Sequence, residues 1–309
     1  MRRNTWRIAG ALAATALALV YARYRRDTRA AAARLRTGSQ IVETSHGQVE
    51  YALAGQGPPV LVVHGGGGGY DQGLLLARFL GLGSRFRCIA VSRFGYLRSP
   101  LPADASPAAQ ADAYAALLDA LELERVAVVG GSAGGPSSLH FALRHPQRCA
   151  ALVLVSALSR AWTWPTMPPI VQDLMLHSGF LFWAVVNFAP QALLSAFGLS
   201  PRAVAGAGKA EKARLVEILQ TILPIRLRWA GLANDANQMA VLAPCPLERI
   251  TVPTLVLHAL DDGLAPFAHG QAAAEAIPGA RLLRLDSGGH LWLGQQETMV
   301  SAVRDFMNF

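Results

Sequence analysis

The sequence contains little cysteine and little charge. Of its 309 residues, 16% are charged and only three are cysteine: Cys88, Cys149 and Cys245. Because these cysteines lie far apart and form no C-x-x-C pair, they predict neither a zinc site nor a set of disulfides, and we expect free thiols. Hydrophobic residues make up 52% of the chain, which is enough for a large core and excludes global disorder.

Net positive charge is missing from most of the chain, although the whole chain carries +8. Residues 1–36 hold nine arginines and one acid, Asp27, which already gives +8. The other 273 residues hold 19 basic and 19 acidic side chains. A nucleic-acid-binding domain carries its positive charge on the folded body, so this class is excluded.

A nucleotide-binding loop is also missing. The glycine run 65–69 is not followed by the Lys-Ser/Thr pair of a phosphate-binding loop. No G-x-G-x-x-G with a ribose-binding acid downstream is present either. We therefore expect no cofactor and no metal.

An apolar run, Ile8–Ala22, lies between arginines near the N-terminus. Trp6 and Tyr24 bracket it, and their spacing of 18 residues corresponds to about 27 Å of helix, close to the thickness of a bilayer. A cleaved signal peptide is the alternative, with Ala16-Leu17-Ala18 as its cleavage site, but that site lies inside the run. A helix that is apolar on all sides does not suit an ordinary surface position. We expect a membrane anchor at residues 6–24.

The arginine count favours one orientation of this anchor. Three arginines precede the run and six follow within about 15 residues, the zone that decides topology. This excess places the following domain on the cytoplasmic side. Cleavage of a signal peptide would export it instead.

Apolar strand segments alternate with helical segments through most of the chain. This alternation is typical of an α/β fold with a mostly parallel central sheet and helices on both faces. The expected strands are 41–44, 48–53, 60–63, 88–91, 126–129, 151–155, 254–258 and 281–285, and the expected helices are 72–80, 108–121, 136–144 and 297–306. The pattern lapses over about 158–247, which we interpret as a helical cap inserted into the domain. The chain is thus divided into an N-terminal segment, 1–36, and one domain, 37–309.

A G-x-S-x-G motif follows the strand 126–129. In Gly130-Gly131-Ser132-Ala133-Gly134 the small neighbours permit a tight strand-to-helix turn that exposes the serine hydroxyl. The helix that follows favours a developing negative charge at its N-terminus. Ser132 is therefore the candidate nucleophile.

A serine nucleophile needs a base and an acid that orients the base. Among eight histidines, His290 follows the last strand in a flexible loop at the carboxyl edge of the sheet, where sites form in such folds. The acid lies between Ser132 and His290 in chain order. Asp261 and Asp262 follow the strand 254–258, and Asp262 is preferred to Asp261.

These motifs together resemble the α/β-hydrolase fold superfamily, in its serine-nucleophile, esterase- and lipase-like branch with a helical cap. The resemblance covers residues 40–309 and rests on four motifs: His64-Gly65-Gly66, the nucleophile elbow Gly130–Gly134, the segment His258–Asp262 and Gly289-His290. In the third, Ala259 replaces the glycine of the family's H-G-x-x-D pattern, which places the acid at Asp262. The resemblance implies an oxyanion hole formed by the N–H groups of Gly66 and Ala133. Gly65 or Gly67 are alternatives to Gly66, because a run of five glycines hides the register.

The resemblance implies a serine hydrolase that cleaves a carboxylic ester or a related acyl bond of a small apolar substrate. The serine at the elbow excludes haloalkane dehalogenases and epoxide hydrolases, which use aspartate there. C–C bond hydrolases, haloperoxidase-like members and a non-catalytic ligand-binding homologue remain as alternatives. Five aromatic residues of the cap form either an acyl pocket or simply the cap core: Trp162, Trp164, Phe180, Phe182 and Trp183. The sequence does not predict an oligomeric state.

Overall fold

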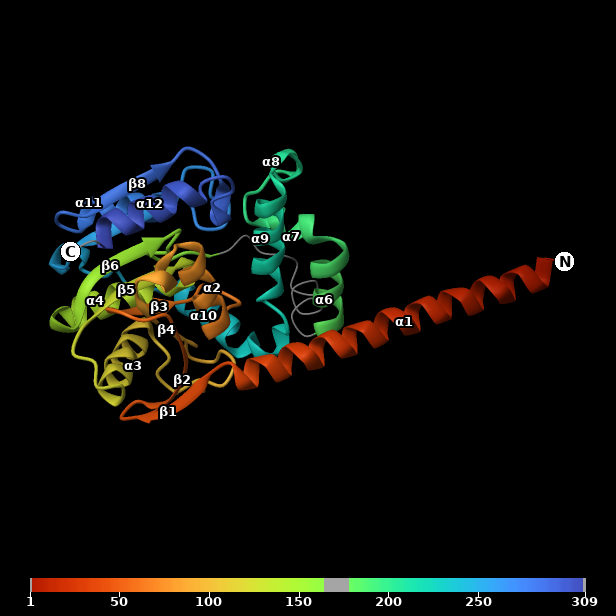
Figure 1. The fold of residues 1–309 in the computed structure, drawn as a ribbon, viewed down its shortest axis with the longest axis horizontal. Coiled ribbons are helices and arrows are strands. Elements are labelled where there is room, and N and C mark those ends of the chain that lie inside the picture. The colour runs from red at the N-terminus through yellow and green to blue at the C-terminus, as the bar shows by residue number, and fades with distance from the viewer. Residues whose placement is uncertain (1, 164–177, 308–309) are drawn as a thin grey trace.

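The computed structural model describes residues 2–163 and 178–307, and they form an α/β fold around one eight-stranded sheet (Figure 1). The strand order is β1-β2-β4-β3-β5-β6-β7-β8. The pairs β1–β2 and β2–β4 are antiparallel, and all other pairs are parallel. The strands are β1 (Gln40–Thr44), β2 (Gly47–Ala54), β3 (Pro59–Val63), β4 (Arg87–Val91), β5 (Val126–Gly131), β6 (Cys149–Val155), β7 (Thr254–Ala259) and β8 (Arg281–Leu285). The predicted fold class is confirmed.

Helices cover both faces of this sheet. Their bounds are α2 (Tyr70–Phe79), α3 (Pro107–Ala120), α4 (Gly135–Arg144), α11 (Ala268–Ala276) and α12 (Gln296–Met307). Side chains of α2 and α12 pack on one face, and those of α3, α4 and α11 pack on the other. The inner strands are buried on both sides, which explains why β3 and β5 are continuous apolar runs rather than alternating ones.

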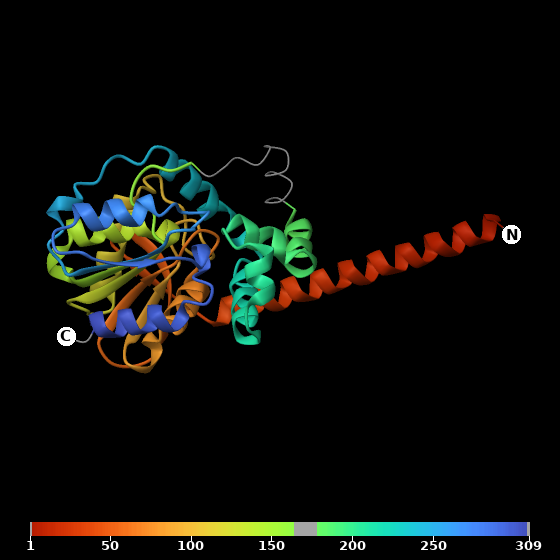
Figure 2. The ribbon, with the colours of Figure 1, turned by 90° about the horizontal axis from the view of Figure 1, so that it is seen from above.

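The segment between β6 and β7 contains the helices of the cap. They are α6 (Gly179–Phe188), α7 (Pro190–Ala196), α8 (Pro201–Gly206), α9 (Lys209–Gln220) and α10 (Trp229–Ala240). Helices α6 to α9 stand beside the sheet, between the main body and the outer part of the N-terminal helix (Figures 1 and 2). Helix α10 lies nearer the sheet than α6 to α9 do (Figures 1 and 2).

The N-terminal segment is one continuous helix, α1 (Arg2–Thr37). The helix continues beyond the anchor predicted at residues 6–24 as far as Thr37. The C-terminal end of α1 is fixed to the body, because Leu35 is buried and its carbonyl accepts a hydrogen bond from Tyr70 Oη at 2.9 Å. The outer part projects away from the body (Figures 1 and 2).

No single helix among the described residues is long and apolar enough to cross a membrane. The pair α6 and α7 meets that criterion only when the two helices are taken together across a bend of 93°. The transmembrane helix expected at residues 6–24 is therefore not supported by the structure.

Candidate active site

The turn after β5 presents Ser132 at the head of α4. Ser132 has a φ of 49°, in the left-handed region that few residues other than glycine adopt. The turn is so tight that a methyl group added to Gly134 would lie 2.6 Å from the carbonyl oxygen of His64. The strained serine and its small neighbours are the features that expose a nucleophilic hydroxyl.

Three predicted site residues lie in one hydrogen-bonded row. His290 Nε2 is 3.0 Å from Ser132 Oγ. On the other side of the ring, His290 Nδ1 lies 2.8 Å from Asp262 Oδ2 and 3.1 Å from Asp262 Oδ1. Since an ionised carboxylate only accepts hydrogen bonds, the proton of a neutral His290 is on Nδ1, and Nε2 is free to accept from the serine.

Asp262 is held in its charged form. Burial by itself raises the pKa of this carboxyl, but the charge of His290 and hydrogen bonds from His258, His290 and Ala265 outweigh burial and lower the pKa below its ordinary value. The backbone N–H groups of Leu264 and Ala265 donate to Oδ1 at 2.9 and 2.8 Å. The carboxylate is therefore fixed in position as well as in charge.

Asp261 has a different environment. Its carboxylate accepts hydrogen bonds from the N–H groups of Gly288 and Gly289, at 3.2 and 2.8 Å, and does not contact the imidazole. These bonds shape the loop that carries His290. The cap holds the same loop from its other side, because Phe197 O accepts a hydrogen bond from His290 N at 3.0 Å.

The glycine run follows β3 and lies against the serine turn. Three of its N–H groups have acceptors within the protein: Gly65 donates to Gln72 Oε1, Gly67 to Tyr96 Oη and Gly68 to Gly65 O, at 3.0, 3.3 and 3.4 Å. Among the described residues, Gly66 N–H has no such acceptor. A methyl group at Gly66 would lie 4.0 Å from Ala133 Cβ, so the two predicted oxyanion donors belong to neighbouring residues in space.

Two further residues hold this loop: His64, which belongs to the motif His64-Gly65-Gly66 but was assigned no role of its own, and Arg93, which was not predicted. His64 is fully buried, and burial followed by the charge of Arg93 lowers its pKa well below the ordinary value, so it is neutral. His64 Nε2 accepts from Arg93 N at 3.0 Å, which places the ring proton on Nδ1, 2.7 Å from Gly65 O. The sequence signal for Arg93 is its position just past the buried strand β4, at the same sheet edge as His64.

The aromatic residues of the cap divide into two groups. Trp162 packs against a small apolar cluster that contains Ala133, the residue after Ser132. Phe180 and Trp183 instead pack against Tyr24 of α1, with ring centroids 5.3 and 5.7 Å from it. Trp164 lies outside the described residues. Phe182 belongs to the same core cluster as Trp183, so Trp162 is the described member of the five that packs against the cluster of Ala133.

Comparison with known proteins identifies the family. A family model for the alpha/beta hydrolase fold matches residues 58–197. YcgS, an uncharacterized hydrolase of Bacillus subtilis, is 30% identical over 269 residues, which are 83% of this chain and 93% of that protein. This chain belongs to the α/β-hydrolase fold family.

Two further relatives agree with that assignment. An alpha/beta hydrolase fold protein from Nakamurella multipartita superposes with a TM-score of 0.73 at 33% identity, covering 87% of this chain and 98% of that one. A protein of Yersinia enterocolitica named as a candidate carbamate hydrolase, RutD, is 33% identical over 235 residues, or 73% of this chain and 77% of that protein. The relatives support a hydrolase of the α/β fold, and they do not fix which bond it cleaves.

Proposed function

We propose that this protein is a serine hydrolase that cleaves a carboxylic ester or a related acyl bond. The observation that carries the proposal is the row Ser132–His290–Asp262, with 3.0 Å between Ser132 Oγ and His290 Nε2 and 2.8 Å between His290 Nδ1 and Asp262 Oδ2. A base within hydrogen-bond reach of a serine, itself oriented by a carboxylate, is the arrangement that makes a weak hydroxyl nucleophilic.

The first half-reaction forms an acyl-enzyme. His290 Nε2 takes the proton of Ser132 Oγ while that oxygen attacks the substrate carbonyl carbon. The charge that develops on the carbonyl oxygen is stabilised by N–H donors. The tetrahedral intermediate then collapses, and His290 gives its proton to the departing alcohol. Asp262 stays ionised throughout and stabilises the imidazolium.

The second half-reaction returns the enzyme to its starting state. A water molecule gives a proton to His290 Nε2 and attacks the acyl carbon. His290 then returns that proton to Ser132 Oγ as the carboxylic acid leaves. Each proton taken by the imidazole is thus returned, so the reaction consumes only substrate and water.

We assign the oxyanion hole to the N–H groups of Gly66 and Ala133. Support comes from the neighbouring N–H groups, since those of Gly65, Gly67 and Gly68 are engaged within the protein and that of Gly66 is not. Ala133 directly follows the nucleophile at the start of a helix, where backbone N–H groups are unpaired. Loss of one such donor costs about 10²- to 10³-fold in kcat.

The substrate class follows from the walls of the site. Apolar side chains form part of these walls: Leu232 and Ile222 lie beside the glycine loop, and Trp162 packs against an apolar cluster that contains Ala133. Small apolar esters fit such a wall, and the RutD relative adds carbamates as a second acyl class to test.

Labelling by a fluorophosphonate probe tests the proposal. The wild-type protein is expected to react at Ser132, and Ser132→Ala to lose the label. Ser137→Ala is the matched control, because Ser137 lies one turn further along α4 and its hydroxyl is bonded to Gly134 O. A hydrolysis screen over acyl chain lengths, with carbamates included, then identifies the preferred bond. A wild-type protein that is neither labelled nor active on any acyl substrate would contradict the proposal.

We also propose that α1 attaches the enzyme to a membrane, with the catalytic domain on the cytoplasmic side. Leu12, Leu17 and Leu19 are 67%, 63% and 67% exposed, although leucine is normally buried. Arginines lie on both sides of this apolar stretch, where they suit anionic lipid headgroups. Export after signal cleavage is the alternative.

A further inference from the structure

The glycine loop 65–69 has no side chains with which to hold its own shape. Instead, three of the carbonyl groups in and before it are bound by two arginines. Arg93 donates from Nε to His64 O at 3.0 Å and from Nη2 to Gly65 O at 3.2 Å. Arg228 donates from Nη1 to Gly68 O at 2.6 Å. The loop conformation therefore depends on where these two guanidinium groups are fixed.

Each arginine is fixed by a carboxylate from the other side of the boundary between core and cap. Arg93 follows β4 in the core, and both of its terminal nitrogens bond to Asp235 on α10 of the cap, at 2.7 and 2.6 Å. Arg228 lies just before α10 in the cap and bonds to Asp71 on α2 of the core, at 3.0 and 2.8 Å. The two ion pairs thus join cap and core on both sides of the loop.

Asp235 also reaches the loop through a second route. Tyr96 Oη donates to Asp235 Oδ2 at 2.6 Å, and the same hydroxyl oxygen accepts the N–H of Gly67 at 3.3 Å. Gly66, between the two anchored glycines, faces the cap: a methyl group there would lie 3.7 Å from Leu232 Cδ2 and 3.9 Å from Asp235 Oδ2. Asp235 therefore helps to fix the position of Gly65 through Arg93 and that of Gly67 through Tyr96.

Burial of these charges argues for a role in geometry rather than in stability. Arg93, Arg228 and Asp235 are 6%, 0% and 4% exposed. Removing an ion pair from water costs about as much as the attraction returns, so apolar residues of similar volume would serve the fold equally well. A planar guanidinium held at two points by one carboxylate, however, fixes the direction of its remaining N–H groups.

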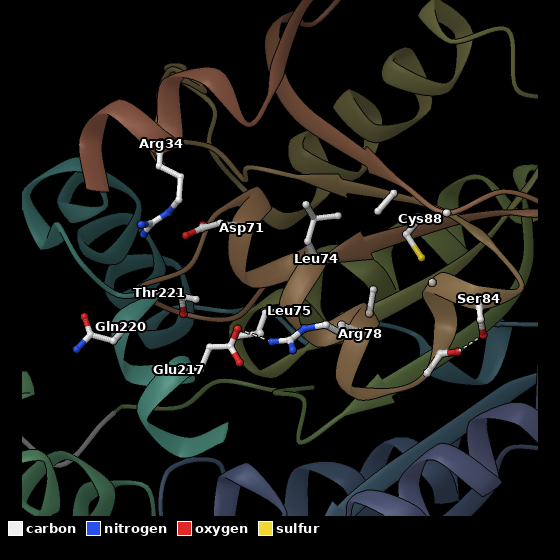
Figure 3. A pocket seen from close by; sticks show the side chains of 15 residues that line it. Arg34, Asp71, Leu74, Leu75, Arg78, Ser84, Cys88, Glu217, Gln220 and Thr221 are labelled. Carbon is white, nitrogen blue, oxygen red and sulfur yellow. Dashed lines mark hydrogen bonds and ion pairs between the residues drawn. The ribbon is translucent and has the colours of Figure 1, made fainter. Parts of the chain in front are cut away.

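The two pairs differ in exposure. Asp71 lines an open groove between α2, α9 and the end of α1, which is also bordered by the ion pair of Arg78 and Glu217 (Figure 3). Asp235 is instead buried, on the side of α10 that faces the glycine loop. The pair Arg93–Asp235 is therefore the one placed to act on the oxyanion hole.

We propose that Asp235 of the cap is a positioning residue for the oxyanion hole: through Arg93 and Tyr96 it sets the direction of Gly66 N–H, so that catalysis requires the cap to be seated on the core. This inference rests on the proposed serine hydrolase. It makes the cap a part of the transition-state site, in addition to any contact with the acyl group.

The test is Asp235→Asn in the full chain, with the ester that the screen identifies as best. An asparagine keeps only one of the two oxygens that hold Arg93, so the guanidinium loses its two-point hold, and kcat is expected to fall by about 10- to 100-fold, less than the roughly 10²- to 10³-fold for complete loss of one oxyanion donor. KM is expected to change by less than about 3-fold, because the N–H groups of the oxyanion hole bind the substrate carbonyl only weakly before the serine attacks. Affinity for a trifluoromethyl ketone, which forms a tetrahedral adduct with the serine, is expected to fall by the same factor as kcat/KM.

A purely electrostatic role for Asp235 predicts the opposite sign. Its replacement by asparagine would leave the positive charge of Arg93 unbalanced near the hole, which would favour the oxyanion and raise kcat. Unchanged or higher kcat/KM in Asp235→Asn, with wild-type protein still labelled by fluorophosphonate, would overturn the inference alone. A wild-type protein that is not labelled would instead overturn the proposed serine chemistry.

Two more variants protect the test against misfolding. Tyr96→Phe removes only the hydroxyl that links Asp235 to Gly67, and we expect kcat to fall by about 3- to 10-fold with KM nearly constant. If Asp235→Asn does not fold, unchanged kcat in Tyr96→Phe overturns the proposal. Asp112→Asn is the control: it breaks a pair with Arg144, on the sheet face opposite α2, and should leave both kcat and KM unchanged.

Discussion

The two adjacent aspartates after β7 have different partners. From the sequence alone, Asp262 is only the preferred candidate for the acid, and Asp261 is the alternative. Asp262 contacts the imidazole of His290, whereas Asp261 binds two backbone N–H groups of the loop that carries it. Each carboxylate thus supports the same histidine, one through its ring and the other through its backbone. Their substitution should have effects of different kinds.

Asp262→Asn is expected to lower kcat by about 10⁴-fold, because an amide in place of the carboxylate holds the imidazole in the wrong tautomer. Asp261→Asn can still accept a hydrogen bond through its amide oxygen, and we expect a loss of less than about 10-fold. Steady-state kinetics on the same ester measures both. Equal, mild losses would move the acid elsewhere, and the reverse ranking would assign the role to Asp261.

The strand-to-helix turn after β5 is limited by the space around Gly134. A methyl group there would lie 2.6 Å from His64 O and 2.9 Å from Val63 O, and backbone atoms cannot move aside cheaply. The carbonyls of Val63 and His64 belong to the segment that leads into the glycine loop. A larger side chain at this position therefore strains the turn and also displaces the glycine loop 65–69.

Gly134→Ala is accordingly expected to destabilise the protein by about 1–3 kcal/mol, the usual cost of overpacking, and to lower kcat. Thermal unfolding followed by circular dichroism measures the first effect. Gly83→Ala is the matched control, since a methyl group there meets nothing within 4 Å, and the unfolding midpoint should not change. A stable, fully active Gly134→Ala would contradict the packing argument.

Elements with strong local patterns could be predicted from the sequence. The apolar runs of β3 and β5, followed by glycine-rich turns, identify a parallel sheet because only strands buried on both faces look like this. The lapse of the strand pattern between β6 and β7 also predicted the helices found there, in the part of that segment that the structure describes. The serine turn and the histidine loop were found because each has a sequence motif of its own.

Contacts between distant segments could not be predicted in the same way. Arg93 and Asp235 are 142 residues apart, and neither stands in a motif. Asp235 is one of four acids in residues 158–247, and nothing in its neighbours separates it from a surface residue. The register of the five glycines was open for the same reason, because the acceptors that engage Gly65 and Gly67 lie on other elements.

Helix α1 is joined to the cap as well as to the core. Tyr24 packs against Phe180 and Trp183 of α6, and the guanidinium of Arg23 lies 5.7 Å from the centroid of the Trp183 ring. Leu35, nearer the core, is buried against it. Only the part of α1 before Val20 is therefore available to a membrane without loss of contacts to the enzyme.

Membrane attachment is therefore best tested by removing the part of α1 before Val20. Full-length protein is expected to sediment with membranes and to resist a high-salt wash, because salt screens the arginines but leaves apolar contacts intact. A chain that begins at Val20 keeps the contacts of Tyr24 and Leu35, so it should stay in the supernatant with unchanged kcat. Leu12→Gln/Leu17→Gln/Leu19→Gln in the full-length chain is the matched control, since it keeps every arginine and should also be released. Full-length protein in the supernatant with Met1 intact would rule out attachment, and a mature chain that starts near Leu19 would establish export.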